Sequence, residues 1–169
     1  MDTVLLRPIA RPLFASWFVA EGVDALRHPA VHTRAAREGV AALRGYVGRV
    51  PVVTEAIDRT LTSVSEQQLG LAVRAHAVAT LAAAGALAAG KAPRTAGLAL
   101  AVLTVPVVVA SLPAARVHDD AESARRRRFF SSVSALGGAL LAAADLEGRP
   151  SIAWRVRAAR EAKAAADDD

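Results

Sequence analysis

Apolar residues gather in four long blocks along the chain, and segments rich in charged residues separate these blocks. Each block holds roughly 20 residues, which as an α-helix reach about 30 Å, the thickness of the hydrocarbon core of a bilayer. The pattern therefore predicts four membrane-spanning helices, at residues 8–26, 69–90, 95–113 and 129–147.

The segment between the first two blocks, residues 30–68, is too polar to cross a membrane. Its apolar residues Val31, Ala35, Val40 and Leu43 recur at helical spacing, and arginines occupy the other faces. This spacing predicts two short amphipathic helices that lie on the membrane surface or cap the bundle. The alternative for this segment is an ordinary polar loop.

Together these patterns predict an all-α fold: a four-helix transmembrane bundle with an amphipathic two-helix insertion between spans one and two. We expect residues 1–166 to form a single membrane domain and residues 167–169 to form a disordered acidic tail. Four spans place both termini on one side of the membrane. Basic residues are almost equally numerous on the two sides, so the positive-inside rule does not decide the orientation.

Local signals mark where some of the helices begin. Ser65 and Gln68 have the spacing of a capping box before the second span. An acidic residue in the cap position predicts a further helix start near Asp120, from which one helix runs through the arginines into the fourth span. In that span, Gly137 and Gly138 permit close contact with another helix.

Composition supports a membrane location and excludes several kinds of chemistry. The chain is 53% hydrophobic but only 4% aromatic, with a mean hydropathy of +0.30. Its apolar residues are mostly alanine and valine, which let helix backbones approach closely in lipid. The absence of cysteine excludes disulfides, thiol catalysis and cysteine-ligated metal centres within this chain. We identify no pair of histidines with metal-binding spacing on a helix and expect no metal site.

Ionisable residues inside predicted spans are the first candidates for function, because charge in a membrane interior is costly. Asp24 near the end of span one and Arg74 near the start of span two are expected at similar depth. Glu21 is a second partner for Arg74, and His76 is expected close by. One hypothesis is an ion pair that holds two helices together. The alternative is a polar pocket for a quinone head group or another small solute.

A second charged group is expected at the opposite membrane surface. Asp145 and Glu147 end the fourth span there, level with Arg7, Arg11 and Lys91. We interpret these residues as a salt-bridge cluster that fixes the fourth span against its neighbours. The alternative is a docking site for a peripheral partner.

Four consecutive arginines precede the fourth span. They are expected to reach lipid phosphates at the membrane surface. The net charge of +5 would also suit nucleic acid, but the run adjoins a predicted span and has no aromatic residues within it. We therefore expect no nucleic-acid partner. The four residues are Arg125, Arg126, Arg127 and Arg128.

Three stretches of the chain carry a family resemblance: GVDALRHP at residues 22–29, GKAPR at 90–94, and RFF at 128–130, which leads through Gly137-Gly138 to DLEGRPSIAWR at 145–155. These stretches resemble the DoxX family of bacterial membrane proteins, in the form found in high-GC bacteria. The resemblance covers roughly residues 5–29 and 69–157. Family members often have Lys-Asn where this chain has Ser131-Ser132, and often have asparagine at the position of His76.

The resemblance implies a four-helix, multi-pass protein of the cell membrane with cytoplasmic N- and C-termini. The DoxX family is named after subunits of a thiosulfate:quinone oxidoreductase, and members have been linked to membrane assemblies that handle oxidative stress.

Three hypotheses for function follow. The first is a non-catalytic subunit or scaffold of a redox or oxidative-stress assembly, with the lipid bilayer, redox-protein subunits or a second copy as partners. This hypothesis agrees with the absence of any recognisable catalytic constellation, so we expect no catalytic activity from the chain alone. The second is a membrane protein that binds a quinone or small solute through the polar cluster between spans one and two. The third is a soluble helical domain.

Overall fold

The computed structural model describes residues 3–48, 52, 54–55, 58–59, 63–113 and 120–145. These residues form helices and no strand, which confirms the all-α class. The helices are α1 (Thr3–Arg27), α2 (Pro29–Val47), α4 (Glu66–Ala88), α5 (Pro93–Ala110) and α6 (Asp120–Ala144).

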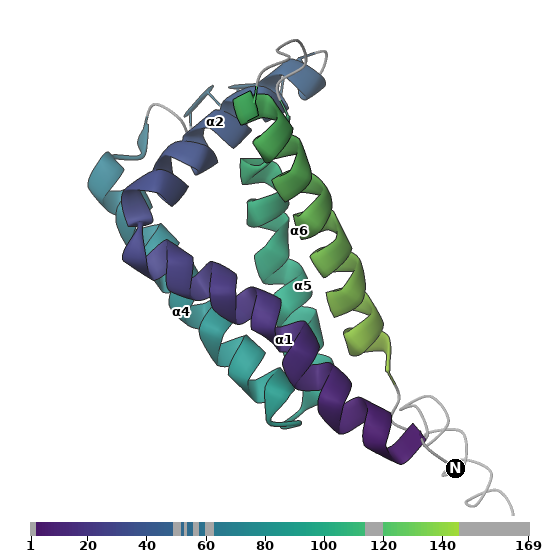
Figure 1. Ribbon diagram of the computed structural model, residues 1–169. Coiled ribbons are helices and arrows are strands. Elements are labelled where there is room, and N and C mark those ends of the chain that lie inside the picture. Colours follow the sequence, from purple (N-terminus) through teal and green to yellow (C-terminus); the bar gives the residue numbers. More distant parts are fainter. Residues whose placement is uncertain are drawn as a thin grey trace, which may run out of the picture.

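The four long helices α1, α4, α5 and α6 pack as two pairs. α1 lies along α4, α5 lies along α6, and α4 also contacts α5. In Figure 1 the two pairs diverge toward one end of the molecule, where α2 crosses from one pair to the other. α2 contacts α5, α4 and α1. The helix that follows α1 therefore packs against the bundle and covers its open end.

Two of the described helices, α4 and α5, are long and apolar enough to cross a membrane. They coincide with the second and third predicted spans. The first predicted span lies within α1, and the fourth lies largely within α6. Both of these helices carry more charged residues along their length and do not meet the same criterion.

The core is built mainly from alanine. Among the described residues, eight of the eleven buried hydrophobic side chains are alanines, and the others are Phe18, Leu87 and Leu100. The ring of Phe18 makes edge-to-face contacts with Phe14 and Trp17, with centroid distances of 5.2 and 5.0 Å. Small side chains allow the helix backbones to lie close together, as expected from the composition.

Glycine permits the closest backbone contacts. A Cβ atom on Gly39 of α2 would overlap the backbone of α5 at Val109 and Ala110. A Cβ on Gly138 would press on the ring of Phe14, so this glycine does permit close contact between α6 and α1. Gly137 has no atom near the position of its missing Cβ, and the expectation of a close contact there is wrong.

The predicted helix starts before the second and fourth spans are confirmed. At the start of α4, the backbone N–H of Gln68 donates to Ser65 Oγ at 3.2 Å. The N–H of Ser65 donates to Gln68 Oε1 at 3.0 Å, which completes the capping box. α6 begins at Asp120 and runs without a break through the four arginines to Ala144.

The predicted insertion is described in part. α2 confirms its first helix, and the alternative of an ordinary loop is wrong for residues 29–47. The second predicted helix falls in the later part of residues 30–68, and many of the residues there lie outside the described ranges. Glu147 and the acidic tail at 167–169 also lie outside these ranges.

Candidate functional site

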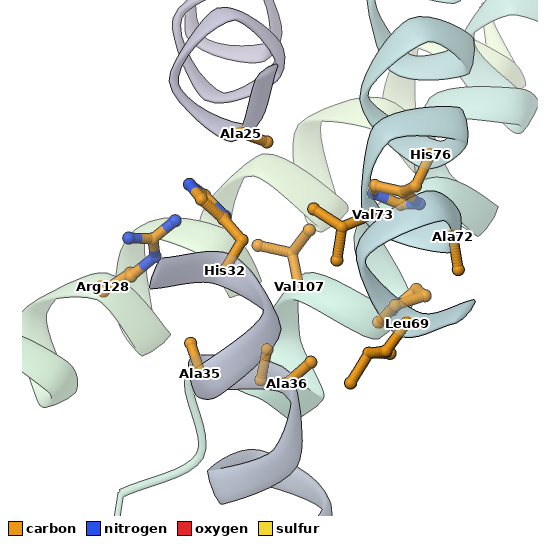
Figure 2. Close-up of a pocket in the computed structure, with 12 residues that line it drawn as sticks. Ala25, His32, Ala35, Ala36, Leu69, Ala72, Val73, His76, Val107 and Arg128 are labelled. Atoms are coloured by element: carbon orange, nitrogen blue, oxygen red, sulfur yellow. The ribbon is translucent and has the colours of Figure 1, made fainter. Parts of the chain in front are cut away.

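A cavity of about 290 Å³ lies beneath α2, where the two helix pairs diverge. All five described helices contribute to its wall. Small and aliphatic side chains of α2, α4 and α5 form most of the lining, and Pro106 of α5 also lines it. Its polar lining residues are His32, His76 and Arg128. Figure 2 shows Arg128 beside His32 on one side of the cavity and His76 on the other.

His32 is held in place by Asp24. Its Nε2 lies 2.8 Å from Asp24 Oδ2, and the second carboxylate oxygen, Oδ1, lies 2.9 Å from Nδ1 of His28. His28 stands at the N-cap of α2, between the last turn of α1 and Pro29. The His32 side chain is only 14% exposed, whereas that of His28 is 60% exposed. Asp24 therefore fixes the imidazole that faces the cavity and joins α1 to α2.

Arg128 is held by Glu21. Its Nη2 lies 2.7 Å from Glu21 Oε2, and both side chains are partly buried. One turn earlier on α1, Trp17 Nε1 donates to Ser131 Oγ of α6 at 3.0 Å. These two contacts tie α1 to α6 and place a guanidinium group in the cavity wall.

His76 differs from the other two polar lining residues. The part of the chain that the structure describes offers its imidazole ring no hydrogen-bond partner. Its side chain faces the cavity from α4 (Figure 2). It also lines a smaller adjoining hollow together with Trp17, Phe18 and Glu21. His76 therefore has both ring nitrogens available for a ligand.

The expected ion pair between Asp24 and Arg74 is wrong. The described contacts of Asp24 are with His28 and His32, and Arg74 lines a separate groove between α2 and α4. Two residues along an α-helix differ by about 200° in direction, so Arg74 and His76 do not face the same space. The chain turn at Pro29 places two histidines close to Asp24. Of the four predicted ligand-binding residues, the cavity and its adjoining hollow contain His76 and Glu21.

Sequence reasoning did not identify the histidine pair that binds Asp24. The signal was present, because Asp24, His28 and His32 follow one another at intervals of four residues. Pro29 lies between the two histidines and hides this signal, because proline usually interrupts a helix. The chain bends at His28, whose φ of −126° and ψ of 54° are not helical, while the N–H of His28 bonds to Asp24 O and that of His32 to His28 O.

The four arginines before span four point in different directions. Arg125 pairs with Glu38 of α2, and Arg128 pairs with Glu21 of α1. Residues three apart share one face of a helix, and the face with Arg125 and Arg128 lies toward α2 and α1. The contact of the four arginines with lipid phosphates stays a prediction. Arg126 and Arg127 are exposed.

At the other end of the molecule, Arg11 and Asp145 line one hollow beside Phe14, as the expected grouping requires. Lys91 is exposed. The side chain of Arg7 and the whole of Glu147 lie outside the described parts, so the rest of this cluster stays a prediction.

An interaction that sequence reasoning missed holds the same end of α6. Nε of Arg94 donates to the carbonyl oxygen of Ala143 at 3.3 Å. Arg94 thus satisfies a carbonyl group in the last turn of the helix, where no partner exists within the helix itself.

Within the described ranges, no group of three or more histidine, aspartate or glutamate side chains is arranged to hold a metal ion. In comparisons with protein-family models, characterised proteins and solved structures, no match to this chain was found.

Proposed function

We propose that this chain is an integral membrane protein in which α1 and α6 cross the bilayer beside α4 and α5. The support is the distribution of large side chains. The core is mostly alanine, whereas large apolar residues stand outward on all four helices. Large apolar side chains on the surface and small ones at helix contacts suit lipid rather than water as the surrounding solvent. The outward residues include Ile9, Leu13, Leu71, Val78, Leu98, Val102, Val105, Phe130, Leu140 and Leu141.

The function we propose is binding of a small amphipathic molecule in the cavity beneath α2, and a quinone is our candidate. The observation that carries this proposal is the unpartnered imidazole of His76 in an otherwise apolar wall, opposite His32 and Arg128 (Figure 2). A few convergent polar groups in an apolar cavity are typical of ligand sites. The volume of about 290 Å³ suits a single-ring head group, and an apolar tail would extend into lipid.

The three polar residues have different parts in this proposal. The imidazole of His76 either donates a hydrogen bond to an oxygen of the head group or accepts one from a hydroxyl group there. Arg128 is anchored through one nitrogen to Glu21 and keeps further N–H donors for a carbonyl oxygen. His32 is held by Asp24 through Nε2, so its Nδ1 is the nitrogen left for a ligand. The chain thus binds and orients the head group.

Quinone titration of the purified protein in mild detergent tests this proposal. Trp17 lines the adjoining hollow, so in a Trp154→Phe background its fluorescence reports occupancy by a short-chain benzoquinone. We expect His76→Ala to weaken binding about tenfold, since one hydrogen bond to the ligand is lost. Val78→Ala, on the outward side of the same helix, is the matched control and should bind as the wild type does. Equal affinity in both variants would exclude His76 from the site.

A second function that we propose is that of a subunit in a redox or oxidative-stress assembly, as in the DoxX family. The sequence resemblance supports it, and the outward apolar faces are surfaces that a membrane partner or a second copy would cover. Purification in a gentle detergent with analysis of co-purifying proteins and quinones tests this proposal. Recovery of the chain alone would count against an assembly. The proposed cytoplasmic location of both termini is tested by reporter fusions at each end.

A further inference from the structure

A second concavity, a groove of about 640 Å³, lies between α2 and α4 on other faces of these helices. One stripe of each helix faces it: Ala30, Thr33, Arg34 and Arg37 from α2, and Gln67, Gly70, Leu71 and Arg74 from α4. The spacing of three or four residues places each stripe on a single helix face. The groove is therefore separate from the cavity that contains His32 and His76.

The groove carries an excess of positive charge. Three guanidinium groups line it, from Arg34, Arg37 and Arg74, and Glu66 contributes one carboxylate. Arg34 and Arg74 are exposed, and neither has an ion-pair or hydrogen-bond partner within the described ranges. Arg44, Arg125 and Arg128 differ in this respect, because they pair with Asp58, Glu38 and Glu21.

Arg37 is positioned but incompletely bonded. Its Nη2 donates to the carbonyl oxygen of Val64 at 3.1 Å, which fixes the guanidinium beside the start of α4. Its Nε is buried and has no hydrogen-bond partner in the described structure. A buried donor without an acceptor is uncommon in proteins and calls for a partner.

The surroundings of the three arginines indicate which kind of anion fits. Gly70 has no side chain and no neighbouring atom at the position of its missing Cβ, so the floor of the groove is open there. Leu71 lines the groove and is 68% exposed, and Val78 continues the outward apolar face of α4 beyond it. A cationic pocket that adjoins an apolar helix face suits a phosphate group attached to acyl chains.

We propose that this groove binds a phosphate group, and that the head group of an anionic phospholipid is its source. The planar guanidinium groups of Arg34 and Arg74 donate paired N–H groups to phosphate oxygens, and Arg37 supplies the third positive charge. The acyl chains lie along Leu71 and Val78. This site goes beyond the ligand cavity proposed above, and only its lipid source rests on the proposed membrane location.

Thermal unfolding in a neutral detergent tests the proposal. The probes are short-chain phosphatidylglycerol, short-chain phosphatidylcholine and inorganic phosphate. We expect phosphatidylglycerol to raise the unfolding midpoint of the wild type and phosphatidylcholine to have no effect. The double variant Arg34→Gln/Arg74→Gln should require about tenfold more phosphatidylglycerol for the same rise, because two phosphate contacts are lost.

The matched control is Arg27→Gln/Lys91→Gln, which removes the same charge from two exposed cationic side chains outside the groove and should respond as the wild type does. Arg34→Lys/Arg74→Lys keeps the charge but loses the paired donors, and it should fall between the two. Stabilisation by inorganic phosphate that only the groove variant loses would support a phosphate site with a free anion as its source. An equal response of the two glutamine double variants, or no response to any probe, would overturn the proposal. Normal quinone binding by the groove variant would keep this test separate from that of the cavity.

Discussion

At the scale of single residues, Asp24 binds two histidines close to it along the chain rather than Arg74. Sequence reasoning correctly placed Glu21 and Asp24 among residues that join helices, but it assigned Asp24 to Arg74. The ring nitrogens of His28 and His32 lie 2.9 and 2.8 Å from the carboxylate instead. Helical spacing alone would have indicated His28, whereas His32, eight residues from Asp24, reaches the carboxylate only because the chain bends at His28.

The substitution Asp24→Asn measures how much the contacts of Asp24 with His28 and His32 contribute to the stability of the protein. We expect this substitution to lower the free energy of unfolding by about 1 kcal/mol, since a half-exposed carboxylate loses charge-assisted bonds to two histidines. Glu55→Gln is the control, because Glu55 and its partner Arg59 are each 72% exposed and such pairs contribute little. Denaturation in detergent measures the free energy of unfolding of both variants. An equal decrease in the two variants would show that the contacts of Asp24 contribute no more than a surface ion pair does.

At the scale of helices, local signals were predictable and packing partners were not. The capping box at Ser65 rests on hydrogen bonds within one turn, and the helix start at Asp120 was indicated by an acidic residue in the cap position, so both could be inferred from sequence. The position of α2 across the open end depends on a glycine that fits against the backbone of another helix. Its amphipathic pattern was equally compatible with a helix lying on the membrane surface.

The packing of α2 predicts opposite effects at two of its glycines. Gly39→Ala should destabilise the protein by about 1–3 kcal/mol, because the added methyl group overlaps α5 backbone that cannot move easily. Gly45→Ala should stabilise it by about 0.5–1 kcal/mol, because nothing lies near that position and alanine favours a helix. Thermal or chemical denaturation of the two variants compares them directly. Stabilisation by both would mean that α2 does not pack closely on α5.

At the scale of the whole molecule, the helical class and four of the described helices were predictable from the apolar blocks. The cavity was not, because it forms where two helix pairs separate, and no single helix carries that information. His76 was identified as a candidate through its unusual position inside an apolar block. His32 was missed because it lies outside the apolar blocks, in a segment where a polar residue is not unusual.

A charge placed on the outward face of α5 distinguishes lipid from water as the surroundings. Val102 is 63% exposed near the middle of this helix. In a membrane, Val102→Arg should cost about 2.5–3.5 kcal/mol of insertion free energy. On a water-exposed surface the same change should stay within about 0.5 kcal/mol. The yield of folded protein in the membrane fraction measures the difference. An unchanged yield, with the wild type in the aqueous fraction without detergent, would identify a soluble helical domain.

The contacts that hold α2 in place also determine the width of the cavity beneath it. Near its start, α2 is joined to α1 through the contact of His32 with Asp24. In its middle, Glu38 binds Arg125 of α6. Near its end, the hydroxyl of Tyr46 donates to the carbonyl oxygen of Pro113. The length of α2 thus sets the distance between the two helix pairs at this end of the molecule. The length of α2 therefore limits the size of the molecule that the cavity can hold. Shortening α2 by one turn would narrow the cavity without altering His76 or Arg128.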